Sequence, residues 1–125
     1  MHEKTFTKVV RIVLALALLF FGLNVFFQFM PAPELSGLAA QVLGGLAASK
    51  YIFPVMAIIF IVAGLMFLFN KASPLAAVLV APFSVNFILY HIFVDWAGWY
   101  MALIFALLNL VLIVAYRDKY MPMLR

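Results

Sequence analysis

The chain has 125 residues, of which 70% are hydrophobic and 10% charged, and its formal net charge is +4. A 14.0 kDa globule cannot bury that much apolar surface in a core of its own, so the composition excludes an ordinary water-soluble domain. The sequence contains no cysteine, which excludes disulfides, thiol redox relays, iron–sulfur clusters and thiolate metal sites.

Four uncharged apolar windows have the length that crosses about 30 Å of hydrocarbon as a helix. They cover residues 12–30, 52–69, 75–94 and 99–116. Each window is apolar throughout rather than alternating, which favours a helix over a barrel strand. The sequence therefore predicts one all-α domain over residues 1–125, an up-and-down four-helix bundle in a membrane.

The first window is too long for the apolar region of a signal peptide, so we interpret it as an uncleaved span. It carries Asn24 and, one turn farther along the same face, Gln28. Pro31 and Pro33 are expected to end this helix. The Gly- and Ala-rich segment 35–49 is too short to cross, and we predict a short interfacial helix between spans one and two.

The later windows differ in their special residues. The second carries Gly64, a small residue that permits close helix packing. The third is interrupted by Pro82, which removes a backbone hydrogen bond and is expected to bend the helix, as in helices that line cavities. The fourth carries Asn109.

The basic residues predict the orientation of the bundle. If the N-terminus is inside, one basic residue, Lys50, faces outward, and seven face inward: Lys4, Lys8, Arg11, Lys71, Arg117, Lys119 and Arg125. The positive-inside rule then places both termini in the cytoplasm, and we expect a multi-pass protein of a bacterial inner membrane. These residues sit at helix ends and form no groove-sized patch, so nucleic acid is not an expected partner.

Polar side chains within the apolar windows are the candidate site. By the helical rise, we expect Asn24, Asn86 and Asn109 all to lie about 15 to 18 Å from the inner edge. On a helical wheel the third span has two polar faces, with Ser84, His91 and Asp95 on one and Asn86 and Tyr90 on the other. Such a span should be packed by protein on both sides, either as the central helix or against a second subunit.

Three interpretations of this polar cluster stay open. In the first, Asn24, Gln28, Asn86, Tyr90 and Asn109 only hold the helices together by hydrogen bonds. In the second, a pocket in the outer half holds a lipid or quinone-like headgroup, with His91 as proton acceptor or donor and Asp95 orienting it. In the third, the cluster is an oligomer contact. A metal site is not expected, because no second histidine lies within the spans.

Several stretches resemble the DoxX-like family of small four-helix membrane proteins. They are FGLN at Phe21 to Asn24, AGLMFLF with Gly64, PLAAVLVAPFSVNFILYHIF in the third span, and AYRDKYMPML near the end. The resemblance implies a four-helix bundle with both termini cytoplasmic, and it gives weight to Asn24, Gly64, Asn86 and His91. Members are associated with quinone-linked oxidoreductases, membrane redox complexes and the assembly of other membrane proteins.

One departure from the family pattern bears on chemistry. Many relatives carry a glutamate shortly before the glycine of the second span, where this chain has Phe60. We therefore expect a non-catalytic membrane protein, a subunit or an assembly or accessory factor of a membrane complex, with lipid and other membrane proteins or further copies of itself as partners. The alternatives are a quinone-linked redox accessory subunit and a small-solute transporter.

Overall fold

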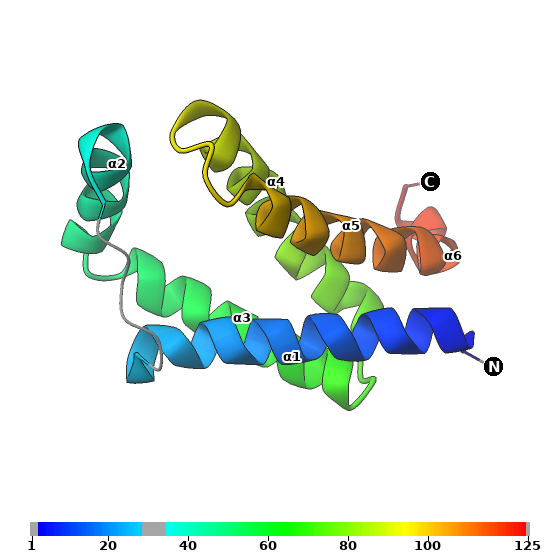
Figure 1. Cartoon of the computed structure of the whole chain (residues 1–125). Coiled ribbons are helices and arrows are strands. Elements are labelled where there is room, and N and C mark those ends of the chain that lie inside the picture. The colour runs from blue at the N-terminus through cyan, green and yellow to red at the C-terminus, as the bar shows by residue number, and fades with distance from the viewer. Residues whose placement is uncertain (1–2, 29–34, 125) are drawn as a thin grey trace.

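A computed structural model describes residues 3–28 and 35–124, and all the regular structure in this part of the chain is helical. The elements, shown in Figure 1, are α1 (Thr5–Phe27), α2 (Gly37–Ala48), α3 (Ile52–Leu68), α4 (Ser73–Phe93), α5 (Trp99–Ala115), α6 (Arg117–Tyr120) and the short 3₁₀ helix η1 (Met121–Leu124). The all-helical fold predicted from the sequence is confirmed.

Within the described residues, two helices are individually long and apolar enough to cross a membrane, namely α1 with 23 residues and α4 with 21. The helices α3 and α5 have 17 residues each, or about 25 Å at the helical rise. They qualify only together with the short helices joined to them: α3 with α2 across a bend of 82°, and α5 with α6 and η1 across a bend of 65°. Two to four crossings are therefore possible, which indicates a membrane protein.

The boundaries of three predicted spans agree with the helices to within two residues, but the first does not. α1 begins at Thr5 instead of residue 12, because Arg11 is accommodated inside the helix and does not mark its edge. Its last residue is Phe27, and Gln28 follows in a left-handed conformation with φ of 52°. Residues 29 and 30 of the predicted span, and the two prolines expected to end it, lie outside the described residues.

α1 and α3 form the closest helix pair, and two glycines permit their approach. A Cβ atom added at Gly22 would lie 3.0 Å from the backbone oxygen of Ala57. A Cβ added at Gly64 would lie 3.2 Å from the backbone oxygen of Ala15. Each helix thus presents a glycine to the backbone of the other, as small-residue packing in membranes requires.

The centre of the bundle is filled by aromatic rings. Phe60 of α3 is 2% exposed, and its ring centroid lies 5.2 Å from that of Phe83 and 6.1 Å from that of Phe105. Phe87 contacts both Phe60 and Phe105. These rings join α3, α4 and α5 in an apolar core around Phe60.

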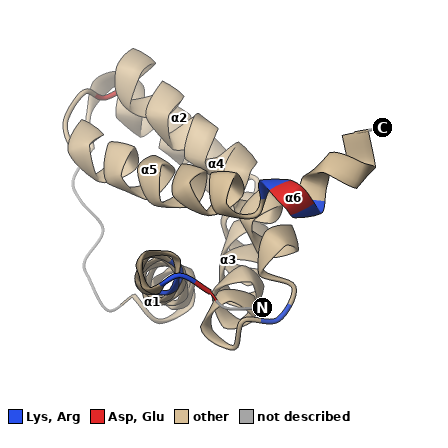
Figure 2. Ribbon diagram, turned by 90° about the vertical axis from the view of Figure 1, so that its right-hand side faces the viewer, with Lys and Arg blue, Asp and Glu red and all other residues tan. Residues whose placement is uncertain are grey.

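The two ends of the bundle differ in charge. The beginning of α1, the turn before α4 and the short helix α6 lie at one end, where Figure 2 shows most of the lysine and arginine. The Tyr120 hydroxyl ties this end together by donating to the backbone oxygen of Pro74 at 2.6 Å. Burial raises the pKa of the Tyr120 phenol, and the neighbouring Tyr116 adds to the rise. At the other end, α2 stands beside the start of α3 (Figure 1).

Candidate functional site

Asn109 is the buried polar centre of the contact between α4 and α5. Its side chain is 2% exposed. The amide nitrogen donates to the backbone oxygen of Ala77 at 3.1 Å, and the amide oxygen accepts the Ser84 hydroxyl at 3.0 Å. Because Asn109 is buried and both its amide nitrogen and its amide oxygen are bonded to α4, it holds α5 to α4 and is not accessible to a ligand.

Asn86 lies in the opposite environment. It follows Ser73, the first residue of α4, by about 20 Å and precedes Phe93, the last, by about 10 Å along the helix axis. The residue is exposed, and no hydrogen bond joins its amide to another described residue. It belongs to a row of exposed residues, which we call the α4 outer stripe: Leu75, Leu79, Pro82, Asn86, Leu89 and Phe93.

The three asparagines do not share one depth. Asn109 lies about 9 Å from Ala115, the end of α5 that faces the termini, whereas Asn86 lies about 20 Å from the corresponding end of α4. Asn24 is half-buried on α1. Asn109 is bonded to Ala77 and to Ser84, so it lies level with the part of α4 that precedes Asn86, and these two amides do not share the expected level.

Two other predicted residues are also placed differently from the expectation. Gln28 is exposed and caps α1 through its backbone N–H, which donates to the Asn24 carbonyl at 2.8 Å, so it does not extend the helical face of Asn24. Pro82 is exposed within the continuous helix α4, outside the pocket between the end of α4 and the beginning of α5. Pro82 does not line that pocket.

His91 and Asp95 are close together, but not through the carboxylate. The His91 Nδ1 atom lies 2.9 Å from the backbone oxygen of Asp95. A carbonyl only accepts, so Nδ1 is the nitrogen that donates in this contact. The Asp95 carboxylate instead accepts the backbone N–H of Ala97 at 3.2 Å. The expected carboxylate–imidazole pair is not formed.

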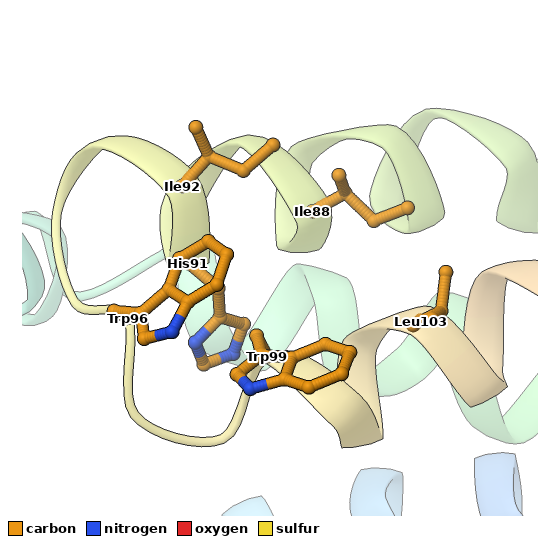
Figure 3. Close-up of a pocket in the computed structure, with 6 residues that line it drawn as sticks. All are labelled: Ile88, His91, Ile92, Trp96, Trp99 and Leu103. Atoms are coloured by element: carbon orange, nitrogen blue, oxygen red, sulfur yellow. The ribbon is translucent and has the colours of Figure 1, made fainter.

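A shallow pocket of about 150 Å³ lies between the end of α4 and the beginning of α5. Figure 3 shows His91 below the indole of Trp96 and beside Trp99, with Leu103 farther along α5. The two indole rings stack with their centroids 5.9 Å apart. The lining of the pocket is mostly apolar. Tyr90 does not line the pocket, but its ring meets the His91 ring edge-on, with centroids 5.1 Å apart.

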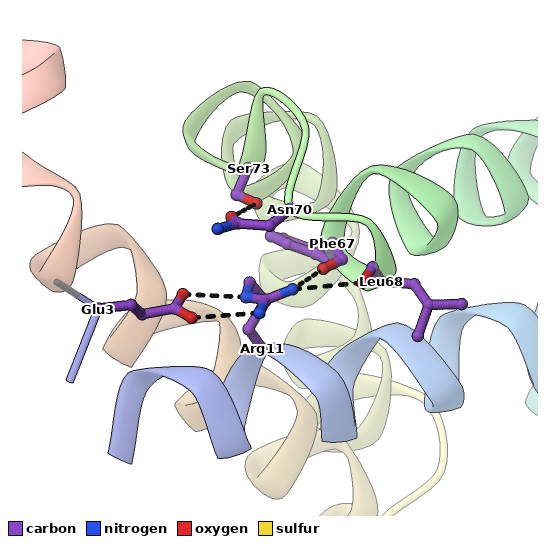
Figure 4. A network of polar contacts seen from close by, with 6 residues as sticks. All are labelled: Glu3, Arg11, Phe67, Leu68, Asn70 and Ser73. Atoms are coloured by element: carbon purple, nitrogen blue, oxygen red, sulfur yellow. Dashed lines mark hydrogen bonds and ion pairs between the residues drawn. The ribbon is translucent and has the colours of Figure 1, made fainter. Parts of the chain in front are cut away.

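Arg11 forms a buried network that the sequence analysis missed. It is 5% exposed, and its guanidinium pairs with Glu3 through Nε at 2.9 Å and Nη2 at 3.1 Å (Figure 4). Nη1 donates to the backbone oxygens of Phe67 and Leu68, the last residues of α3. Arginine thus satisfies carbonyls that the end of a helix leaves free.

One signal in the sequence could have revealed this network. Glu3 is the only acidic residue before the first span, and Arg11 directly precedes a long apolar run. An acid placed where helix α1 begins can turn back onto a base two turns later. The positive-inside count alone gives Arg11 no role beyond that of an inner basic residue.

No family model, no curated protein and no solved structure matches this chain. The resemblance to the DoxX-like family stays a prediction from the sequence motifs. Among the described residues, no three His, Cys, Asp or Glu side chains lie together as metal ligands would.

Proposed function

We propose that this chain is a non-catalytic subunit or accessory factor of a membrane complex, which binds a membrane-embedded partner through the outer stripe of α4. The single observation that carries the proposal is the exposed amide of Asn86 in the middle of an apolar helix. An amide facing hydrocarbon without a hydrogen bond is unfavourable, and such residues commonly bond across helices. A protein partner at this face would supply the missing donor and acceptor.

The proposal includes four membrane crossings with both termini in the cytoplasm of a bacterial cell. The basic residues gathered near the termini support this orientation. The bend of 82° between α2 and α3 supports an interfacial α2, since a helix perpendicular to a spanning one lies along the membrane surface. We keep membership of the DoxX-like family as part of the proposal, on the sequence motifs quoted above.

The packing of the interior supports a non-catalytic role. Phe60 and its aromatic neighbours fill the centre, where proton or redox chemistry would need polar groups. A proton-coupled transporter needs a carboxylate within its spans, and the helices α1, α3, α4 and α5 contain none. Both features favour a binding protein over a redox or transport protein.

The pocket beside Trp96 and Trp99 supports a second candidate function, the holding of a lipid or quinone-like headgroup. Tryptophan is typical of the membrane–water interface, where such headgroups lie. The His91 Nε2 atom could accept a hydrogen bond from a hydroxyl there. The redox version of this idea is weaker, because Asp95 does not pair with the imidazole.

The main proposal is tested by extracting the protein from its native membranes in a mild detergent and measuring the complex by native mass spectrometry. We expect the unmodified chain in a complex larger than its 14.0 kDa mass. The variant Asn86→Leu should shift the protein toward the monomer. Native mass spectrometry also reports any lipid or quinone that remains bound, which tests the second candidate.

A matched control is Val85→Leu, which changes an exposed residue of α4 that lies beside the outer stripe. This variant should leave the complex intact. Recovery of the unmodified chain as a lone monomer, or equal loss of the complex in both variants, would contradict the proposal.

A further inference from the structure

We infer that the partner of the α4 outer stripe is a second copy of this chain, in a parallel two-fold dimer with Asn86 facing Asn86. This inference rests on the proposed function, since it names the partner of the same surface. Three features of the described residues lead to it: the spacing along the stripe, the chemistry of the amide, and the geometry that a membrane imposes on two copies.

The outer stripe of α4 has a spacing compatible with a coiled-coil seam, and Asn86 is what distinguishes it from the exposed apolar faces of α1, α3 and α5. The members of the outer stripe, at positions 75, 79, 82, 86, 89 and 93, follow each other at alternating intervals of four and three residues. All six are exposed, so the seam is not used within the chain. It extends over the length of the helix, and it is apolar except at Asn86.

The chemistry of the stripe suits a copy of itself. No member is charged, so the surface offers nothing to a charged partner. The amide of Asn86 is both donor and acceptor, so two such amides can satisfy each other reciprocally. A single asparagine at a seam position of a parallel coiled coil is known to fix register and the number of strands.

The membrane decides the depth at which two copies meet. Two copies inserted in the same orientation are related by an axis along the membrane normal, and such a dimer brings each residue near its own equivalent. Asn86 would therefore find an amide at its own depth without a further requirement. A different partner protein would need a polar group of its own at that depth. A second copy of this chain has Asn86 there by symmetry.

Tyr90 lies one helical turn beyond Asn86, at the edge of the same face. It is half-buried. It adds a second polar residue beside the stripe, one turn from Asn86. The leucines on either side, Leu79 and Leu89, would pack the contact above and below.

The inference is tested by disulfide cross-linking in native membranes. The chain has no cysteine, so a single introduced cysteine is its only thiol. Leu79→Cys and Leu89→Cys place the thiol on the stripe. Val62→Cys on α3 and Leu107→Cys on α5 serve as controls, because both residues are exposed and lie on helices other than α4.

Oxidation should give a homodimer of twice the 14.0 kDa chain mass from the two stripe variants and little from the two controls. Adding Asn86→Leu to Leu79→Cys should weaken dimerisation about tenfold, the size expected for one interhelical amide contact. Asn86→Gln keeps an amide and should retain more of the dimer.

Each other outcome overturns a defined part of the reasoning. A cross-linked product of a different mass on the stripe would overturn the second copy while leaving the proposed membrane partner in place. Equal dimer from stripe and control positions would show random collision and overturn the inference. If the stripe variants gave no product and the native extract held only monomer, the proposed function would fail as well.

Discussion

Polar side chains lie in opposite environments in the interior of the helices and on the outer stripe of α4. Inside, Asn109 and Arg11 are buried and bonded to groups of their own chain. Outside, Asn86 is exposed, with no bond to a described residue. The difference teaches that polar residues in an apolar chain have two separate uses, one in holding the fold and one in meeting another molecule.

The largest expected effect is on the interior side of this comparison, at Arg11. Arg11→Leu removes the partner of Glu3 and the donor to the end of α3, so we expect a loss of about 2 to 3 kcal/mol in the free energy of unfolding. Unfolding in a denaturing detergent, followed by circular dichroism, measures it. Lys8→Leu, at an exposed position one turn earlier, is the control and should have little effect.

A second prediction concerns the buried amide itself. Asn109→Leu breaks both bonds to α4 and should lower the free energy of unfolding by about 1 to 2 kcal/mol. The same measurement on the purified protein decides it. A variant as stable as the parent would mean that the α4–α5 contact depends on its apolar packing alone.

A third and smaller loss of unfolding free energy is expected at Ser84, which donates to Asn109. Ser84→Ala removes one donor to Asn109 and should cost about 0.6 kcal/mol. Because the two residues share a bond, the double variant with Asn109→Leu should lose less than the sum of the two single losses. Strict additivity would contradict a direct interaction.

The smallest effect on the fold is expected on the outer stripe. Asn86→Leu should change the unfolding free energy of the detergent-solubilised monomer by less than about 0.5 kcal/mol, since an exposed residue without partners is removed. The same change should weaken association in the membrane. If Asn86→Leu instead destabilised the monomer as much as Asn109→Leu, the contrast between the two faces would be lost.

Particular residues mark where prediction from the sequence succeeded and failed. The bounds of α3, α4 and α5 are predictable to within two residues, because long apolar runs bounded by polar turns have clear ends, whereas the short helices α6 and η1 carry no such signal. The start of α1 was missed, because a basic residue was assumed to stay outside an apolar helix. In one of the three interpretations Asp95 orients His91, but the turn after α4 brings the Asp95 backbone carbonyl, and not its carboxylate, to the ring.

The sequence by itself determined that the chain is helical and apolar enough to enter a membrane, because hydropathy and window length depend on composition and order alone. It also placed three asparagines within the apolar runs. Only the tertiary structure decided which of these is buried, since that depends on the rotation of each helix about its axis when it packs. A uniformly apolar helix carries no periodic signal that fixes this rotation, and so the contrast between Asn109 and Asn86 became visible only in three dimensions.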